Sequence, residues 1–87
     1  ISIEAQAAVN DYELAVETYF TNKENLALAI RIEQKNQSKY FEGMASTLEL
    51  RQAQLQLYSA QNSYISSIQN VIQKKLNLEI LLNTSEL

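Results

Sequence analysis

The chain has 87 residues with one Gly and no Pro, Cys or His, and its formal net charge at pH 7 is −3. This length allows one small domain at most, and so few turn-forming residues exclude sandwiches, barrels and βαβ folds. Without Cys or His, disulfides, zinc–thiolate sites and the commonest general base are excluded, so we expect a protein that binds or builds, not an enzyme, with no cofactor and no metal.

The first predicted helix spans residues 3–41 and carries two apolar rows at helical spacing. Residues 1–30 of the chain hold five acids against one Lys, and no basic stripe with interleaved aromatics is present, so no nucleic-acid partner is expected. The spacing of both rows indicates helix faces that pack on partners. One row comprises Ala5, Val9, Tyr12, Val16, Tyr19, Leu26 and Ile30, with Tyr40 completing the register; the other comprises Ile3, Ala7, Leu14, Leu28 and Ile32.

A predicted tip, residues 42–46, interrupts the helical pattern. Gly43 suits the left-handed position that closes a helix. Ser46 followed by Glu49 forms the pattern of a capping box that opens a second helix, and Thr47 is the alternative N-cap. The tip divides the chain into two equal arms, which predicts an antiparallel hairpin.

The second predicted helix spans residues 47–83 and also carries two apolar rows. A seven-residue repeat of this kind predicts a left-handed coiled coil with a partner helix. The repeat comprises Leu50, Leu57, Tyr64, Val71 and Leu78, with Ala53, Ala60, Ile68 and Leu82 beside it. The second row comprises Leu48, Leu55, Tyr58, Ile65, Ile72 and Leu76.

Residues 52–73 contain no charged side chain. Their number would suit a membrane span, but Gln, Asn and Ser are too frequent among them for a lipid-facing helix. We therefore expect no direct membrane insertion. The neutral polar side chains suit either a soluble surface or the wall of a water-filled cavity.

The predicted fold class is all-α, a long antiparallel two-helix coiled-coil hairpin that occupies residues 1–87 as a single unit. In a hairpin, one apolar row of each helix is buried against the other helix. The remaining rows need further partners, so the isolated chain is expected to self-associate. The chain is interpreted as a fragment of a larger bundle. The residues expected to pack the helices are Tyr12, Tyr19, Leu26, Leu50, Leu57, Tyr64, Val71 and Leu78.

Residues 39–54 resemble the helix–turn–helix tip of the TolC-like outer-membrane efflux proteins. The matches to the family pattern are Tyr40, Gly43, the triplet Leu48-Glu49-Leu50 and the run Gln52-Ala53-Gln54. The likeness continues through residues 57–64 and 75–82, and upstream through residues 19–32. The C-terminal pattern looks more like the second of the two hairpins in each family protomer than the first.

This resemblance implies a stave of a trimeric export duct, in the periplasmic helical barrel of a Gram-negative outer-membrane protein. Each helix of such a barrel packs on two neighbouring helices. The hairpin tips dock the periplasmic adaptor (membrane fusion) protein of a tripartite efflux pump. By the resemblance, the residues of the adaptor-binding tip are Tyr40, Glu42, Gly43, Met44, Ala45, Ser46, Thr47 and Glu49.

The tip departs from the family pattern at two positions. Ala45 stands where some members have an Arg, and Gln52 stands where a second acid occurs, so a gate closed by ion pairs is not expected. Purely structural interpretations also exist: Gly43 is a helix cap, Met44 folds back on Leu48, and the acids of the tip are solvated. An exposed tip offers no pocket in which two acids could catalyse hydrolysis.

The alternative function is a generic antiparallel coiled-coil interaction or scaffold module with no role in transport. The seven-residue repeat of the second helix supports this alternative equally well. A cleavable signal peptide and flanking β-strands in the parent protein would favour the duct. A cytosolic parent without strands would favour the module.

Overall fold

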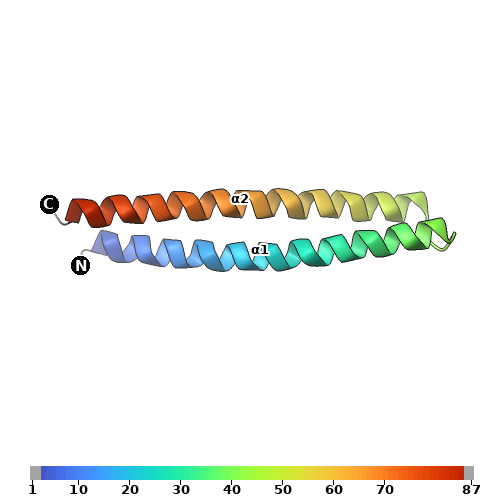
Figure 1. Ribbon diagram of the computed structural model, residues 1–87, viewed down its shortest axis with the longest axis horizontal. Coiled ribbons are helices and arrows are strands. Elements are labelled where there is room, and N and C mark those ends of the chain that lie inside the picture. Colours follow the sequence, from blue (N-terminus) through green and yellow to red (C-terminus); the bar gives the residue numbers. More distant parts are fainter. Residues whose placement is uncertain (1–2, 86–87) are drawn as a thin grey trace.

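The computed structural model describes residues 3–85, which form two helices of 39 residues each, α1 (Ile3–Phe41) and α2 (Thr47–Ser85). The helices run antiparallel and side by side along their whole length, and the tip joins them at one end (Figure 1). The molecule measures 66 × 13 × 13 Å. The predicted all-α two-helix hairpin is confirmed, with α2 ending two residues beyond the predicted 83.

The contact between the helices, here called the seam, follows an unbroken repeat of three and four residues. Every seam position is buried or half-buried, and such a repeat is the geometry of a left-handed coiled coil. In α1 the seam comprises Ala5, Ala8, Tyr12, Ala15, Tyr19, Asn22, Leu26, Ala29, Glu33 and Asn36. In α2 it comprises Leu50, Ala53, Leu57, Ala60, Tyr64, Ser67, Val71, Lys74, Leu78 and Leu81.

Small side chains occupy the most buried seam positions. Ala5, Ala15 and Ala53 are at most 5% exposed, and so is Ser67. No large side chain among the described residues is fully buried. Small residues let two helix backbones approach closely. The space between the helices is then narrow, and larger seam residues such as Tyr64 are only half-buried.

The predicted membership of the rows needs correction at several positions. In α1, Ala8, Ala15 and Ala29 lie in the seam where Val9, Val16 and Ile30 were expected; both valines flank it half-buried, and Ile30 and Tyr40 are 37% and 39% exposed. In α2, Ser67 and Leu81 take the places expected for Ile68 and Leu82. Close approach of the backbones selects the small residues and leaves the branched ones at the flanks.

Polar side chains link the two helices halfway along the seam. The hydroxyls of Tyr19 and Tyr64 lie 3.4 Å apart, and their rings stack with centroids 5.6 Å apart. Asn22 Nδ2 donates to the backbone oxygen of Ser63 at 3.2 Å. The buried Ser67 hydroxyl donates to the Tyr64 backbone oxygen at 2.6 Å, so this buried polar group has a hydrogen-bond partner within α2.

Within residues 3–85, neither helix combines the length and the apolar character that a membrane crossing requires. Many large apolar side chains outside the seam, such as Leu14, Leu55 and Ile65, remain exposed. On α2 they form the second predicted row, on the side that α1 does not cover. The hairpin therefore has apolar surface that its own two helices leave in water.

Candidate functional site

The tip begins where Gly43 closes α1. Its φ is +78°, the left-handed region that favours glycine. The amide of Met44 donates to the Lys39 carbonyl at 2.7 Å, and the amide of Gly43 donates to the Tyr40 carbonyl at 3.0 Å. These two bonds form a Schellman motif, which satisfies the last carbonyls of the helix and fixes the direction in which the chain leaves it.

The tip ends where Ser46 opens α2. The amide of Glu49 donates to Ser46 Oγ at 3.1 Å, and the amide of Leu50 donates to the Ser46 carbonyl at 3.1 Å. Ser46 is therefore the N-cap, and Thr47, the alternative, is the first residue of α2. Caps on both sides make the tip a well-defined turn of five residues, 42–46.

Apolar side chains project from this turn into solvent. Phe41 is 82% exposed, Met44 is 75% exposed and Leu48 is 64% exposed. The rings of Tyr40 and Phe41 meet edge to face with centroids 5.9 Å apart. With both Met44 and Leu48 exposed to this degree, the tip presents apolar groups instead of folding them inward. Such a cluster on a capped turn is a candidate contact for another protein.

The remaining predicted tip residues lie around this apolar cluster. Glu42, Gly43, Ser46, Thr47 and Glu49 are exposed, and Ala45 is half-buried. Glu49 lies in the first turn of α2, and Lys39 lies in the last turn of α1, where each charge opposes the helix dipole favourably. All eight predicted residues lie within residues 40–49, and Glu42 and Glu49 are the two acids among them.

Sequence reasoning did not place Phe41 among the tip residues, although it is the most exposed aromatic side chain there. The signal was present in the sequence. Phe41 is the last residue of α1, one position after the predicted row member Tyr40. A helix turns about 100° per residue, so its side chain points away from the face that Tyr40 occupies.

The eight predicted packing residues are all half-buried in the seam, at successive layers from Leu50 near the tip to Leu78 near the open end. One of them, Tyr64, has an altered pKa. The hydrogen bond with the Tyr19 hydroxyl raises the pKa of Tyr64 above its usual value, with smaller contributions from desolvation and from the charge on Tyr19. The raised pKa means that the fold stabilises the protonated phenol of Tyr64.

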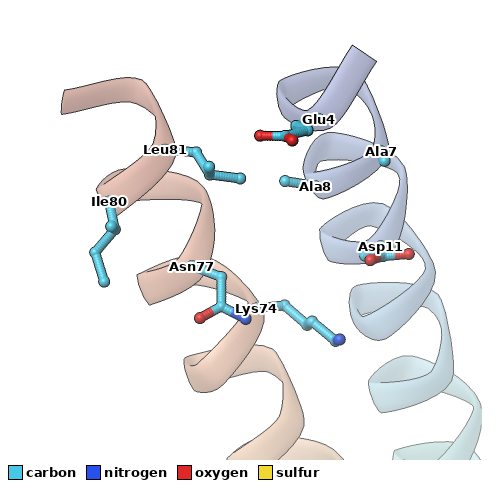
Figure 2. A pocket seen from close by; sticks show the side chains of 8 residues that line it. All are labelled: Glu4, Ala7, Ala8, Asp11, Lys74, Asn77, Ile80 and Leu81. Carbon is cyan, nitrogen blue, oxygen red and sulfur yellow. The ribbon is translucent and has the colours of Figure 1, made fainter. Parts of the chain in front are cut away.

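A groove of about 480 Å³ lies between the helices at the end opposite the tip. Figure 2 shows Lys74 of α2 extending toward α1, which carries Glu4 and Asp11. The lining of this groove also includes small and apolar side chains, namely Ala7, Ala8, Ile80 and Leu81. No three acids among the described residues are close enough together to hold a metal ion.

A second groove of about 700 Å³ runs along one side of the hairpin near its middle. Hydroxyl and amide side chains dominate its lining, and none of the lining residues is charged. The lining comprises Thr18, Asn22, Leu55, Tyr58, Ser59, Asn62, Ser63, Ser66, Ser67 and Asn70. This side of the hairpin is uncharged, with hydroxyl and amide groups beside the exposed apolar side chains of Leu55 and Tyr58.

The chain was compared with known proteins in three ways. Among protein-family models, curated proteins and solved structures, none matches the chain.

Proposed function

We propose that the chain is a structural stave of a TolC-like export duct in the periplasm of a Gram-negative bacterium. In this role the hairpin forms part of the tunnel wall, next to other hairpins of the same trimer. Its tip docks the periplasmic adaptor protein of a tripartite efflux pump. The family assignment comes from the resemblance of residues 39–54.

One observation carries the docking role, the exposed apolar cluster on a rigid tip. Phe41, Met44 and Leu48 project from a turn whose two ends are capped by hydrogen bonds. A turn with a fixed conformation loses little conformational entropy on binding, so a partner gains affinity from contacts that already point outward. Apolar side chains with polar neighbours at the rim are the usual anatomy of a protein interface.

A further observation agrees with the role of tunnel wall. The groove along the middle of the hairpin is lined by neutral hydroxyl and amide side chains together with Leu55 and Tyr58, and α2 carries no charge between residues 52 and 73. An uncharged wall attracts neither cationic nor anionic solutes strongly. Such a wall suits a conduit that holds no cargo tightly.

The test uses Gram-negative cells that express the full-length protein carrying this hairpin. Gly43→Trp places an indole at the tip, where a Cβ would meet no atom within 4 Å, so the added bulk points outward. Because φ is +78°, a side chain there also strains the backbone. Gly43→Asn is the matched control, since Asn tolerates the left-handed region and adds little bulk.

Efflux of a dye substrate and the amount of assembled trimer are measured together. We expect Gly43→Trp to reduce efflux roughly tenfold at an unchanged trimer level, which is the effect of losing a central interface contact. Gly43→Asn and Glu17→Trp, an exposed site far from the tip, should behave as wild type. Met44→Asp repeats the test without backbone strain. Wild-type efflux in both tip variants, with normal assembly, would refute the docking role.

A generic coiled-coil scaffold is the second candidate function, and the unbroken seam of the hairpin favours it. Such a module needs no periplasmic location and no adaptor. Cell fractionation of the full-length protein separates the two proposals. Recovery in the outer-membrane fraction supports the duct, and recovery in the cytosol supports the scaffold.

A further inference from the structure

The chain carries a single sulfur atom, the thioether sulfur of Met44. Its composition includes one Met and no Cys, Trp or His. Thiols and thioethers are the side-chain groups that hydrogen peroxide oxidises most readily. Oxidation of this chain by peroxide is therefore concentrated on one side chain.

Met44 lies in the tip, where little of the hairpin shields it. Its side chain is 75% exposed, and it follows Gly43, whose left-handed conformation turns the chain away from α1. The amide of Met44 donates to the Lys39 carbonyl at 2.7 Å, so the backbone is fixed while the side chain projects into solvent. Figure 1 shows the tip at the end of the molecule opposite both termini. An oxidant in solution reaches the sulfur without any opening of the hairpin.

The side chains around Met44 determine what its oxidation changes. Phe41 and Leu48 are 82% and 64% exposed, so the sulfur belongs to an apolar cluster that faces solvent. Oxidation to the sulfoxide converts this apolar side chain into a polar one with a strong hydrogen-bond acceptor. A partner that covers the cluster with apolar groups must desolvate that oxygen without offering it a donor, which weakens binding.

We propose that Met44 is an oxidation site at which hydrogen peroxide switches off docking of the tip. The sulfur lone pair forms a bond to one peroxide oxygen, the O–O bond breaks, and the second oxygen leaves as water after a proton transfer. Sulfur loses two electrons and peroxide gains them. A methionine sulfoxide reductase reverses the step with a dithiol, which becomes a disulfide while the sulfoxide oxygen leaves as water. The switch rests on the proposed docking role, whereas the oxidation itself does not.

The position of Met44 makes this oxidation a change in binding and not a lesion of the fold. A methionine packed in an interior disrupts that interior when it is oxidised, because a polar group replaces an apolar one. Met44 lies outside the seam. The turn is held by backbone hydrogen bonds and by Ser46 Oγ, and the side chain of Met44 takes part in none of them. We therefore expect the oxidised hairpin to keep its helices and its turn.

The first test follows oxidation of the 87-residue chain by hydrogen peroxide. Mass spectrometry measures the rate of sulfoxide formation at residue 44, with N-acetylmethionine amide as the fully exposed reference. We expect the two rates to be similar. We also expect the oxidised and unoxidised chains to have the same melting temperature by circular dichroism. Much slower oxidation at residue 44, or a lowered melting temperature, would show a sulfur packed into the fold and overturn the proposal.

A sulfur moved into the seam is the matched control. Leu57→Met in a Met44→Leu background keeps one Met in the chain and nearly conserves side-chain volume. Residue 57 is half-buried. This sulfur should oxidise more slowly than the sulfur of the wild type, and its oxidation should lower the melting temperature. Equal rates and equal melting temperatures for the two positions would count against a site defined by its exposure at the tip.

The second test measures dye efflux in Gram-negative cells that express the full-length protein, before and after a brief exposure to hydrogen peroxide. Each protein is compared with its own untreated cells. Wild-type efflux should fall roughly tenfold, the loss expected for a central interface contact, and should recover as cellular reductases act. Met44→Leu has no sulfur at the tip, so peroxide should leave its efflux at its own untreated value. An equal fall in both proteins, or unchanged efflux in wild-type cells whose residue 44 is oxidised, would overturn the switch.

Met44→Gln separates this switch from the docking role itself. Gln carries a polar oxygen on a side chain of similar length, so its efflux in untreated cells should be about as low as that of the peroxide-treated wild type. Wild-type efflux from Met44→Gln at a normal trimer level would overturn the docking role, and the switch with it. Low efflux from Met44→Gln together with peroxide-resistant efflux from the wild type would overturn the switch alone.

Discussion

Replacing Ala15 by Leu tests the close packing of the seam. Ala15 is 2% exposed, and the small side chains at Ala5 and Ala53 are similarly buried. The larger side chain adds three carbon atoms at a position where the two backbones are held close by alanine. The helices must then separate locally, or the new side chain must adopt an unfavourable rotamer.

The expected loss follows from this overpacking. Inserting methylene groups into a well-packed interior costs about 1–3 kcal/mol. Helix propensity changes little from Ala to Leu, so it does not mask the effect. For a domain of this size, 1 kcal/mol shifts the melting temperature by about 4–8 °C. Ala15→Leu should therefore lower the melting temperature by about 5–20 °C.

Thermal unfolding followed by circular dichroism at 222 nm measures this shift. Ala27→Leu is the matched control, because Ala27 lies on the same helix but is exposed, and its melting temperature should stay close to that of the wild type. All three chains are compared at one concentration, since self-association makes the melting temperature concentration-dependent. If Ala15→Leu melts with or above Ala27→Leu, the close approach of the helices at this layer is wrong.

Three further outcomes are expected. Gly43→Ala should reduce the free energy of unfolding by about 1–2 kcal/mol, because φ is +78° and the cost is conformational and not steric; equal stability in urea unfolding would contradict this. Ser46→Ala should cost about 1 kcal/mol through loss of the N-cap, whereas Thr47→Ala should be nearly neutral, and the reverse order would identify Thr47 as the cap. The raised pKa of Tyr64 favours its protonated form in the folded hairpin, so this stabilisation is complete below about pH 10 and is lost as pH rises through the folded-state pKa. Unfolding free energies measured between pH 9 and 11.5 should fall less steeply in Tyr19→Phe, and identical slopes would exclude the Tyr19 hydrogen bond as the cause.

The hairpin itself was predictable from few residues. One Gly, followed three residues later by a Ser with an acid in the capping-box position, defined the tip between two long uninterrupted helical patterns. Local chemistry determines both ends of the turn, as the bonds to the Lys39 carbonyl and to Ser46 Oγ show. Tertiary contacts were not needed to place these boundaries.

The choice of seam residues was not predictable from spacing alone. In α1 the set with Val9 and Val16 and the set with Ala8 and Ala15 both keep a three–four spacing. Hydrophobicity favours the valines, but helix separation decides the outcome, and it depends on the partner helix. The alanine set allows closer backbones, so the valines flank the seam.

The tip was predictable as a site only by position and resemblance. Sequence reasoning located the turn and its acids, but it left the exposure of Met44 open and did not include Phe41. Exposure at the end of a long helix depends on where the partner helix stops covering it. The structure supplies this by showing Phe41 and Met44 at 82% and 75% exposure.

The proposed function is tested most directly by photo-crosslinking at the tip in intact cells. A photoreactive phenylalanine analogue replaces Met44 in the full-length protein, and the same analogue at Glu17 on the exposed side of α1 is the control. We expect an adduct between residue 44 and a periplasmic adaptor protein, identified by mass spectrometry, and none from residue 17. Adducts from residue 44 with cytosolic proteins only, or adaptor adducts from both positions alike, would contradict it.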